Sequence, residues 1–427
     1  MKKVLLIAFY FNQTNEIASK RLRALAKYLP QYGWEPIVIV PDLGNLNMEG
    51  INCNVVQTPY IDMMDKWMGK NKSNLSDESE KQETIIKDST SVNNQVLSKI
   101  VSIAGEIFAY PDGMKYWYKP TMEAASKIIE EANIDAIITS SWPVTSHKIG
   151  KDLKIKYQIP WIADLRDLWN MNPYISHTHI RTYFEKRLEI KTFEQANVLT
   201  TTTPLAAETL SKLHPNNIIV PILSGFDPDD FKKLNITKTV TNDKLNLTYA
   251  GSLYQGKRDP TILFKALKEL IDEGLIDSNK IKLNFYGETG NLKELKTKYE
   301  LNDIVNIGGF LPHDDVLMKQ ANSDVLLLIS WNNPKEKMFI PGKVYEYLAL
   351  KRPVLSIGYQ EGSLKNLIED TKMGAHVSNL KDTKNALLNF YNEFISNGQV
   401  EFKANEKVNV YSMIQTAANF GKLLDNL

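Results

Sequence analysis

The residues with the clearest chemical potential are Pro341-Gly342-Lys343 and, one turn later, Glu346, at the start of a helix pattern. Pro341 can open a helix because its missing N–H would have no partner in the first turn. Gly342 lets another group approach the backbone closely, and the free N–H groups at the positive end of a helix attract phosphate. Lys343 adds a positive charge, and Glu346 can accept hydrogen bonds from hydroxyl groups. The segment therefore predicts a site for a phosphate beside a sugar, as in a nucleotide sugar. The alternative is an ordinary Pro-Gly helix start that binds nothing.

The elements around this segment are those of a parallel sheet. Val325–Ile329 is a continuous apolar run, which is typical of a strand buried on both faces. Pro353–Ile357 begins the next strand after the helix. Because open α/β sheets bind ligands at the carboxyl ends of their strands, the predicted site lies where such a sheet would position it.

The same alternation of strands and helices runs through both halves of the chain. In the first half, strand patterns cover 4–9, 36–40, 134–139, 160–165, 198–201 and 218–223. In the second half, they cover 245–250, 281–286, 304–307, 325–329, 353–357 and 374–377. We expect an α/β fold with two doubly wound, Rossmann-like domains that face a cleft.

Length and composition limit the class of protein. The chain has 427 residues, enough for two domains that each bury a core. Its 51 basic and 50 acidic residues balance, which argues against a nucleic-acid-binding protein. Cys53 is the one cysteine, which excludes an intrachain disulfide and favours a reducing compartment, the cytoplasm. No apolar run reaches the length of a membrane span, and the run 4–11 is interpreted as a first strand rather than a signal peptide.

Residues 62–109 interrupt the alternation. Lys70–Asn94 is polar and lacks apolar periodicity, which indicates an insertion. Val96–Phe108 has an amphipathic pattern, and aromatic residues follow it. Two interpretations stay open: contact with a membrane surface, which would make the protein peripheral at the inner face of the cell membrane, and an ordinary helix that packs on the core.

Polar residues at the ends of strands in the first half form a second group of candidates. Asp164, Arg166 and Asp167 end or follow a buried strand. A carboxylate there could orient or deprotonate a hydroxyl group, whereas an Arg-Asp pair that shapes the loop is the alternative. Arg21 follows the first strand and could face a phosphate. His147 lies in a helix pattern, where a structural histidine with satisfied hydrogen bonds is favoured over a catalytic one.

Together these segments resemble the GT-B glycosyltransferases, specifically the family-4-like bacterial enzymes that build capsule, O-antigen and related surface glycans. The segments that carry the resemblance are Phe9-Tyr10-Phe11, Ser19-Lys20-Arg21, Ala26–Leu29, Pro160–Trp169, Gly225-Phe226-Asp227, Gly251–Pro260 and Pro341–Ala349. The resemblance covers nearly the whole chain except residues 62–109.

The resemblance implies a retaining transfer of a hexose or an N-acetylhexosamine from a nucleotide diphosphate donor, with UDP favoured. It implies an acceptor-binding domain over 1–223, to which the helix 409–427 returns, and a donor-binding domain over 224–408. The acceptor would be a glycan or a polyprenyl-linked lipid. Enzymes of this fold usually need no metal, because cationic side chains and helix ends stabilise the leaving diphosphate, so no metal or other cofactor is expected here.

On the donor side, the resemblance assigns residues one by one. Glu346 resembles the second glutamate of the family's Glu-x7-Glu signature, which holds the donor ribose. Met338 stands at the position of the first glutamate, and Glu336 is close by but out of register. In the loop after Gly251, Ser252 stands where a basic residue is usual.

The same loop supplies a second basic residue, which would contact the diphosphate. Lys257 or Arg258 matches it, with Arg258 favoured, and a solvated pair of loop residues is the alternative. Gly309, Phe310 and Leu311 match the loop whose backbone pairs with the base. On the acceptor side, the phosphate of the donor is often thought to take the proton in retaining enzymes, so the aspartate at 167 would position the acceptor rather than act as a base.

Two acidic clusters have the composition of metal ligands. Asp227–Asp230 and His313–Asp315 lack ligand spacing and are interpreted as turn and helix-cap residues, so no metal is expected. Two rival functions stay open: a UDP-sugar 2-epimerase, which shares the fold, and a non-catalytic subunit of the same fold that binds a glycan or a partner transferase. Met338 and Ser252 keep the second rival open.

Overall fold

The computed structural model describes residues 1–12, 17–44, 46–61, 110–174, 177–232 and 243–427. Its contacts divide the chain into two compact units. The N-terminal unit comprises 1–201, 207–221 and 417–427, and the C-terminal unit comprises 202–206 and 222–416. The sequence predicts domain bounds at 223/224 and 408/409, and these stay a prediction. The predicted insertion 62–109, with its polar segment and amphipathic helix, lies outside the described residues.

The N-terminal unit is built on a parallel sheet. Its described strands have the order β3-β2-β1-β4-β5-β6-β7. They are β1 (Lys2–Ile7), β2 (Trp34–Pro41), β3 (Asn54–Thr58), β4 (Ala136–Ser140), β5 (Trp161–Leu165), β6 (Val198–Thr201) and β7 (Ile218–Pro221). The chain moves outward from β1 to β3 and then returns to place β4 beside β1, so the topological switch point of this sheet lies between β1 and β4.

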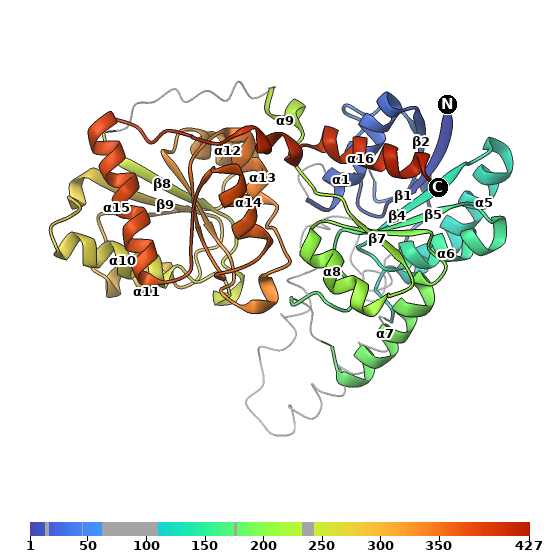
Figure 1. Cartoon of the computed structure of the whole chain (residues 1–427), viewed down its shortest axis with the longest axis horizontal. Helices are drawn as coiled ribbons and strands as arrows, with labels where there is room; N and C mark the ends of the chain where they lie inside the picture. The colour runs from blue at the N-terminus through green and yellow to red at the C-terminus, as the bar shows by residue number, and fades with distance from the viewer. Residues whose placement is uncertain (13–16, 45, 62–109, 175–176, 233–242) are drawn as a thin grey trace. The chain divides into compact units, whose positions relative to one another are not determined.

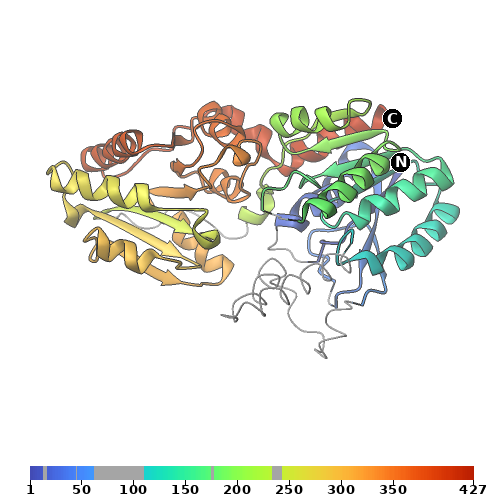
Figure 2. The same ribbon diagram turned by 90° about the horizontal axis from the view of Figure 1, so that it is seen from below.

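Helices flank this sheet (Figure 1). They are α1 (Ile17–Tyr28), α5 (Tyr118–Ala132), α6 (Thr145–Tyr157), α7 (His179–Phe193), α8 (Pro204–Leu213) and α16 (Met413–Asp425), with the short η1 (Leu29–Tyr32) and η2 (Lys115–Trp117). The last turns of α16 pack on this unit, where Trp34 Nε1 donates to Asp425 Oδ1 at 3.0 Å and Arg21 lies 5.1 Å from the ring centre of Phe420. The two termini of the chain therefore lie near each other (Figure 2).

The C-terminal unit repeats the design. Its described strands have the order β10-β9-β8-β11-β12-β13, all parallel. They are β8 (Leu245–Ala250), β9 (Ile281–Tyr286), β10 (Val305–Gly309), β11 (Val325–Ile329), β12 (Val354–Ile357) and β13 (Gly374–Val377). The helices are α9 (Pro228–Lys232), α10 (Thr261–Asp272), α11 (Leu292–Lys298), α12 (His313–Ala321), α13 (Lys343–Leu350), α14 (Ser363–Thr371) and α15 (Leu380–Asn397). Its switch point lies between β8 and β11.

The central strand β11 shows why the sheet needs helices on both faces. Val325, Leu327 and Ile329 belong to one hydrophobic cluster, together with residues of α10 and α15. Leu326 and Leu328 belong to a second cluster, with residues of α13 and α14. Successive side chains of a strand point to opposite faces, so an uninterrupted apolar run fills two cores. The predicted α/β fold with two parallel sheets is confirmed.

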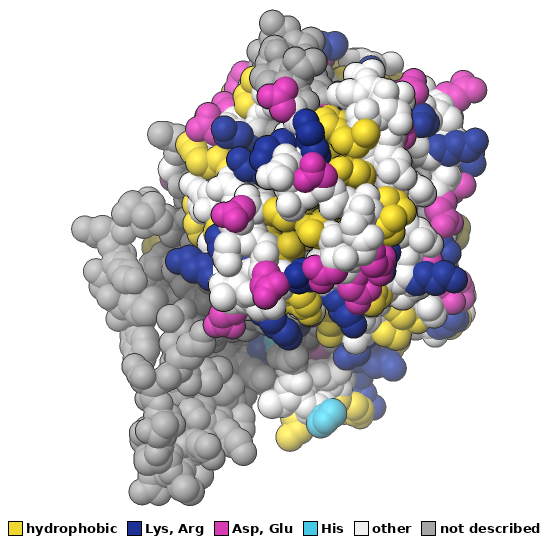
Figure 3. Space-filling view, turned by 90° about the vertical axis from the view of Figure 1, so that its left-hand side faces the viewer, with side chains coloured by type: hydrophobic (Ala, Val, Ile, Leu, Met, Phe, Trp, Pro, Cys, Tyr) yellow, Lys and Arg dark blue, Asp and Glu magenta, His cyan; other side chains and the backbone are white. Residues whose placement is uncertain are grey.

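The surface of the C-terminal unit agrees with the balanced composition. Figure 3 shows the face that carries α10, α11 and α15, where basic and acidic side chains are interspersed. Several of them are paired, as between Lys384 and Glu269 at 3.1 Å and between Lys268 and Asp272 at 2.7 Å. In the part of the chain that the structure describes, no helix is long and apolar enough to cross a membrane.

Candidate active site

The exit loops of β8 and β11 bring most of the predicted donor residues together. These adjacent strands flank the switch point of the C-terminal sheet, where open α/β sheets bind ligands. The loop after β8 begins at Gly251, and the loop after β11 begins at Ser330 and leads to α13. The side chain of Lys343, the first residue of α13, reaches the end of β8.

Lys343 and Gly251 are matched to each other. Gly251 has a φ of +135°, a region that residues with a side chain rarely adopt. A Cβ atom built on it would collide with Nζ of Lys343, so the absence of a side chain at 251 makes room for the ammonium group. The same Nζ lies 5.1 Å from the ring centre of Tyr249, within the range of a cation–π contact.

A second cation, Arg258, lies close enough to Lys343 to affect its charge. Burial and, to a smaller extent, the positive charge of Arg258 lower the pKa of Lys343 to about 7, against the opposing effect of the carboxylate of Glu346. Arg258 lies 4.2 Å from the ring centre of Tyr254 and donates to the carbonyl of Ser252 at 3.4 Å. The β8 exit loop therefore holds two neighbouring cations, Lys343 at Gly251 and Arg258 at Ser252, an arrangement that an anion would stabilise.

Neighbouring contacts shape the β8 exit loop. The hydroxyl of Tyr249 donates to the carbonyl of Ser252 at 2.7 Å, and Oγ of Ser252 donates to Glu288. Lys257 Nζ lies 5.2 Å from the ring centre of Trp331, which joins this loop to the β11 exit loop. Sequence reasoning missed Tyr249, Glu288 and Trp331 as site residues, because strand and loop patterns carry no sign of these contacts.

The predicted base-binding loop follows β10. Gly287 N donates to the carbonyl of Gly309 at 2.7 Å, and Gly309 has a φ of +68°. The loop is therefore held at the carboxyl end of β9, next to β8. The side chain of Phe310 is 83% exposed and Leu311 is half-buried.

The start of α13 differs from the predicted open helix end. Gly342 is the N-cap residue, but Val344 N donates to Pro341 O at 3.1 Å and Tyr345 N donates to Gly342 O at 3.2 Å. These two N–H groups are already used within the turn, so the positive charge of Lys343 is the stronger attraction for an anion.

The residues near the missing first glutamate have structural contacts. The carbonyl of Met338 accepts from Oγ1 of Thr203 at 2.7 Å. Glu336 is buried, at the end of the short η5 (Pro334–Glu336).

In the N-terminal unit, Asp164 is enclosed by hydrogen-bond donors. Arg21 donates Nε to Oδ2 and Nη2 to Oδ1, both at 3.0 Å. Ser140 Oγ donates to Oδ2 at 3.0 Å, and Thr200 Oγ1 donates to Oδ1 at 2.8 Å. Both members of the Arg21–Asp164 pair are almost fully buried. This pair fastens α1 to β5 and lies too deep to meet a substrate.

Arg166 and Asp167 lie closer to the surface. Arg166 Nη2 and Asp167 Oδ2 are 2.7 Å apart, and the side chain of Asp167 is 34% exposed. Ser141, in the β4 exit loop, accepts from Arg166 Nε through its carbonyl at 3.2 Å and donates Oγ to the carbonyl of Asp167 at 2.7 Å. Asp167 is therefore the predicted carboxylate that can meet a substrate hydroxyl.

His147 is a core residue. Its side chain is fully buried, its Nδ1 is 2.8 Å from Oγ1 of Thr139, and its ring packs edge-on against Phe193. Burial lowers its pKa to about 3, so the ring is neutral at physiological pH. The ring is therefore part of the core, but only Nδ1 has a hydrogen-bond partner and the buried Nε2 has none among the described residues, so the expected full satisfaction of its hydrogen bonds is not seen.

The two acidic clusters lie at the starts of helices α9 and α12, which they stabilise. Asp227, the residue before α9, accepts through Oδ1 from Asp229 N in the first turn of that helix at 3.0 Å. Asp314 and Asp315 lie in the first turn of α12, where negative charge stabilises a helix.

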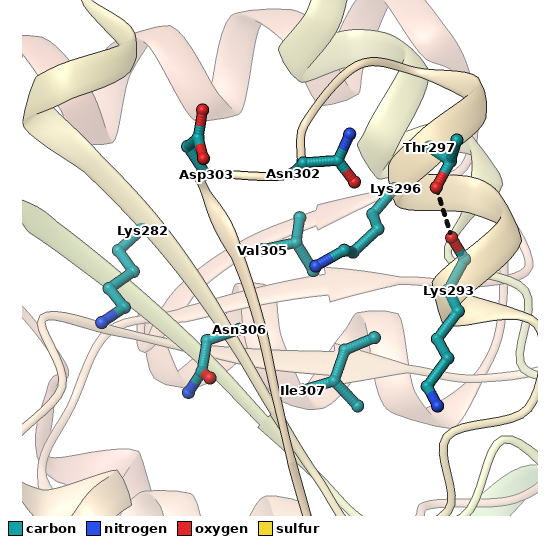
Figure 4. A pocket seen from close by; sticks show the side chains of 9 residues that line it. All are labelled: Lys282, Lys293, Lys296, Thr297, Asn302, Asp303, Val305, Asn306 and Ile307. Atoms are coloured by element: carbon teal, nitrogen blue, oxygen red, sulfur yellow. Dashed lines mark hydrogen bonds between the residues drawn. The ribbon is translucent and has the colours of Figure 1, made fainter.

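A surface hollow lies elsewhere on the C-terminal unit, at the outer edge of its sheet (Figure 4). It has a volume of about 700 Å³ and contains none of the predicted site residues. Lysine side chains from β9 and α11, namely Lys282, Lys293 and Lys296, line it. The lysines are spread around an open hollow and do not converge on one point (Figure 4), unlike the basic groups at Gly251.

Comparison with known proteins bears on these sites. Residues 244–393 match the model of the family described as Glycosyl transferases group 1. No curated protein sequence matches the chain.

Solved structures match along nearly its whole length. Sucrose-phosphate synthase of Thermosynechococcus elongatus has a TM-score of 0.64 at 14% identity, over 100% of this chain and 99% of that chain. HepE of Anabaena, solved with UDP, has a TM-score of 0.61 at 13% identity, over 100% of both chains. A protein of Listeria monocytogenes described as a UDP-N-acetylglucosamine 2-epimerase has a TM-score of 0.53 at 12% identity, over 98% of this chain and 95% of that chain. Identities this low show a shared fold alone.

Proposed function

We propose that this glycosyltransferase of the GT-B fold, whose residues 244–393 match the group 1 family, moves a sugar from a UDP-type nucleotide sugar to a glycan or lipid-linked acceptor in surface polysaccharide synthesis. The transfer would retain the configuration of the sugar. The enzyme would act in the cytoplasm, at the inner face of the cell membrane.

One observation carries the proposal: Lys343, over the bare backbone of Gly251, and Arg258, at the carbonyl of the next residue Ser252, bring two cations to the switch point of the C-terminal sheet. A diphosphate gains negative charge as it leaves the sugar, and fixed cations stabilise that charge. The complex of HepE with UDP shows that a protein of similar fold holds this kind of group. Lys343 would supply the second cation that is absent at Ser252.

The other donor contacts follow from the same loops. Glu346 would accept hydrogen bonds from the ribose hydroxyls, since it lies one turn after Lys343 on α13. The backbone of Phe310 and Leu311 would pair with the base. With two cations at the diphosphate, the reaction would need no metal.

The acceptor would meet Asp167 and Arg166 in the N-terminal unit. The bond between the anomeric carbon and the diphosphate oxygen breaks, the acceptor oxygen bonds to that carbon, and its proton passes to the leaving phosphate. Asp167 would orient the acceptor hydroxyl, and Arg166 would hold Asp167 through their 2.7 Å pair. The buried pair of Arg21 and Asp164 would support the β5 exit loop, which carries Arg166 and Asp167, and would take no part in the reaction.

Two rival functions are separated by one experiment. The protein is incubated with UDP-glucose, UDP-galactose and UDP-N-acetylglucosamine, and the nucleotide and sugar products are resolved by chromatography. Release of UDP, slow with water and faster with a glycan or polyprenyl-phosphate sugar acceptor, supports the transferase. An epimerised UDP-sugar with no UDP would show the epimerase, whose structural relative keeps that rival open. If a donor binds but no product forms with any of them, the protein is a non-catalytic subunit. Asp167→Asn is the matched control, because it should bind the donor but transfer slowly.

A further inference from the structure

Helix α7 buries two carboxylates and exposes large apolar side chains, which is the reverse of the usual surface helix. Residues Glu185, Glu189, Thr192 and Phe193 are buried. Three large apolar side chains face outward instead: Ile180 is 73% exposed, Tyr183 is 54% exposed and Phe184 is 54% exposed. A surface helix normally buries its apolar side chains and exposes its charges, so the outer face of α7 calls for an explanation.

Both carboxylates on the buried face have polar partners, which fix the orientation of the helix, although Oγ1 of Thr192 has none in the part of the chain that the structure describes. Glu185 Oε1 is paired with Arg181 Nε at 2.7 Å. Glu189 accepts from Asn170 Nδ2 at 2.5 Å, and its other oxygen is 3.3 Å from Nε2 of His214. Turning α7 to hide its aromatic residues would separate Glu189 from Asn170 and His214, and a buried carboxylate that loses its hydrogen-bond partners is strongly destabilising. The outward aromatic residues are thus part of the folded design.

The outer face combines aromatic, aliphatic and basic side chains. Ile180, Tyr183, Phe184, Arg187 and Lys191 follow the spacing of one helical face. The guanidinium of Arg187 lies 4.7 Å from the ring centre of Tyr183, and the rings of Tyr183 and Phe184 meet edge to face at 5.6 Å. Lys186, at the border of this face, is exposed too. The outer face of α7 is defined here as Ile180, Tyr183, Phe184, Arg187 and Lys191.

We propose that the outer face of α7 docks on an anionic lipid surface. Aromatic rings favour the boundary between water and hydrocarbon, and basic side chains beside them bind acidic headgroups. A second copy of the chain fits this face less well, because pairing the face with itself would bring Arg187 and Lys191 of both copies into one interface, where like charges repel. The proposal rests on α7 alone and does not depend on the proposed function.

Co-sedimentation of the full chain with vesicles tests the proposal. One set of vesicles is phosphatidylcholine alone. The other contains about one third phosphatidylglycerol, which gives the surface a negative charge. We expect binding to the anionic vesicles only, and weaker binding as salt rises. Arg187→Gln should reduce the partition coefficient about fivefold, the change that removal of one basic residue near such a surface produces. The double variant Tyr183→Ser, Phe184→Ser should bind at background level.

Leu275→Ser is the matched control, since Leu275 is an exposed apolar side chain (47%) on the C-terminal unit. It should bind as the wild type does. Circular dichroism and thermal unfolding check that the α7 variants fold, and Arg187→Gln keeps the proposal testable if the double variant does not. Equal binding of wild type and Arg187→Gln to anionic vesicles would overturn the proposal. A dimer in sedimentation velocity that Arg187→Gln or the double variant abolishes would also overturn it, and would assign the face to a second copy.

Discussion

Binding of a nucleotide diphosphate should take up a proton at Lys343. In the free protein, burial and the neighbouring Arg258 lower the pKa of this ammonium group to about 7, against the effect of Glu346. A diphosphate beside it adds negative charge and returns the pKa toward the ordinary value of lysine. The free site is then less protonated than the occupied one above pH 7, so linkage makes the affinity fall as pH rises.

The size of the effect follows from the pKa. About half of the free Lys343 side chains carry a proton at pH 7, and about 1% do so at pH 9. The affinity for UDP should therefore fall by up to about 50-fold between these pH values, or about 2.3 kcal/mol. Lys343→Arg should lose most of this dependence, because a guanidinium stays charged throughout the range.

Isothermal titration calorimetry measures the proton directly. UDP is titrated into the protein at about pH 8, where its phosphates are already deprotonated, in two buffers that differ in ionisation enthalpy. The difference in observed enthalpy should give an uptake of about 0.9 proton for wild type and close to none for Lys343→Arg. Equal enthalpies in both buffers for the wild type, or the same uptake in the variant, would refute the reasoning.

Three further predictions concern stability and turnover. Gly251→Ala must adopt a strained φ and displace Lys343, so it should lower the free energy of unfolding by about 1–3 kcal/mol in urea; a folded variant with unchanged UDP affinity in calorimetry would contradict the matched pair. Asp164→Asn leaves the buried Arg21 without its countercharge and should lower the free energy of unfolding by about 3–5 kcal/mol; an unchanged urea midpoint would show that the pair is not structural. Asp167→Asn should keep both its stability, within about 0.5 kcal/mol, and its UDP affinity, yet slow sugar transfer about tenfold or more; wild-type turnover would remove this carboxylate from the site.

The inner strands of both sheets can be predicted from the sequence, because a strand covered on both faces is a continuous apolar run. The predicted bounds of the inner strands β6, β8, β9 and β11 are those of the structure, and so are those of the edge strand β13. β3 (Asn54–Thr58) was not predicted. It lies at the edge of its sheet and mixes two valines with polar residues, so its sequence lacks that signal.

Contacts between distant segments could not be predicted. Asp164 resembles a catalytic carboxylate because it ends a strand, but its partner Arg21 lies 143 residues away and only the fold shows the pair. Lys343 was a predicted site residue, yet the ring of Tyr249 beneath it was missed for the same reason. The buried Glu189 of α7 is equally invisible in the sequence, since carboxylates normally face water.

The central claim is that the exit loops of β8 and β11 bind a nucleotide diphosphate. The most direct test is thermal unfolding of the wild type and Glu346→Ala with UDP, GDP and dTDP. One nucleotide at about 100 times its dissociation constant should raise the free energy of unfolding by about 2.7 kcal/mol, and Glu346→Ala should weaken that binding by about 1–3 kcal/mol. If no nucleotide shifts the unfolding of the wild type, the account is contradicted.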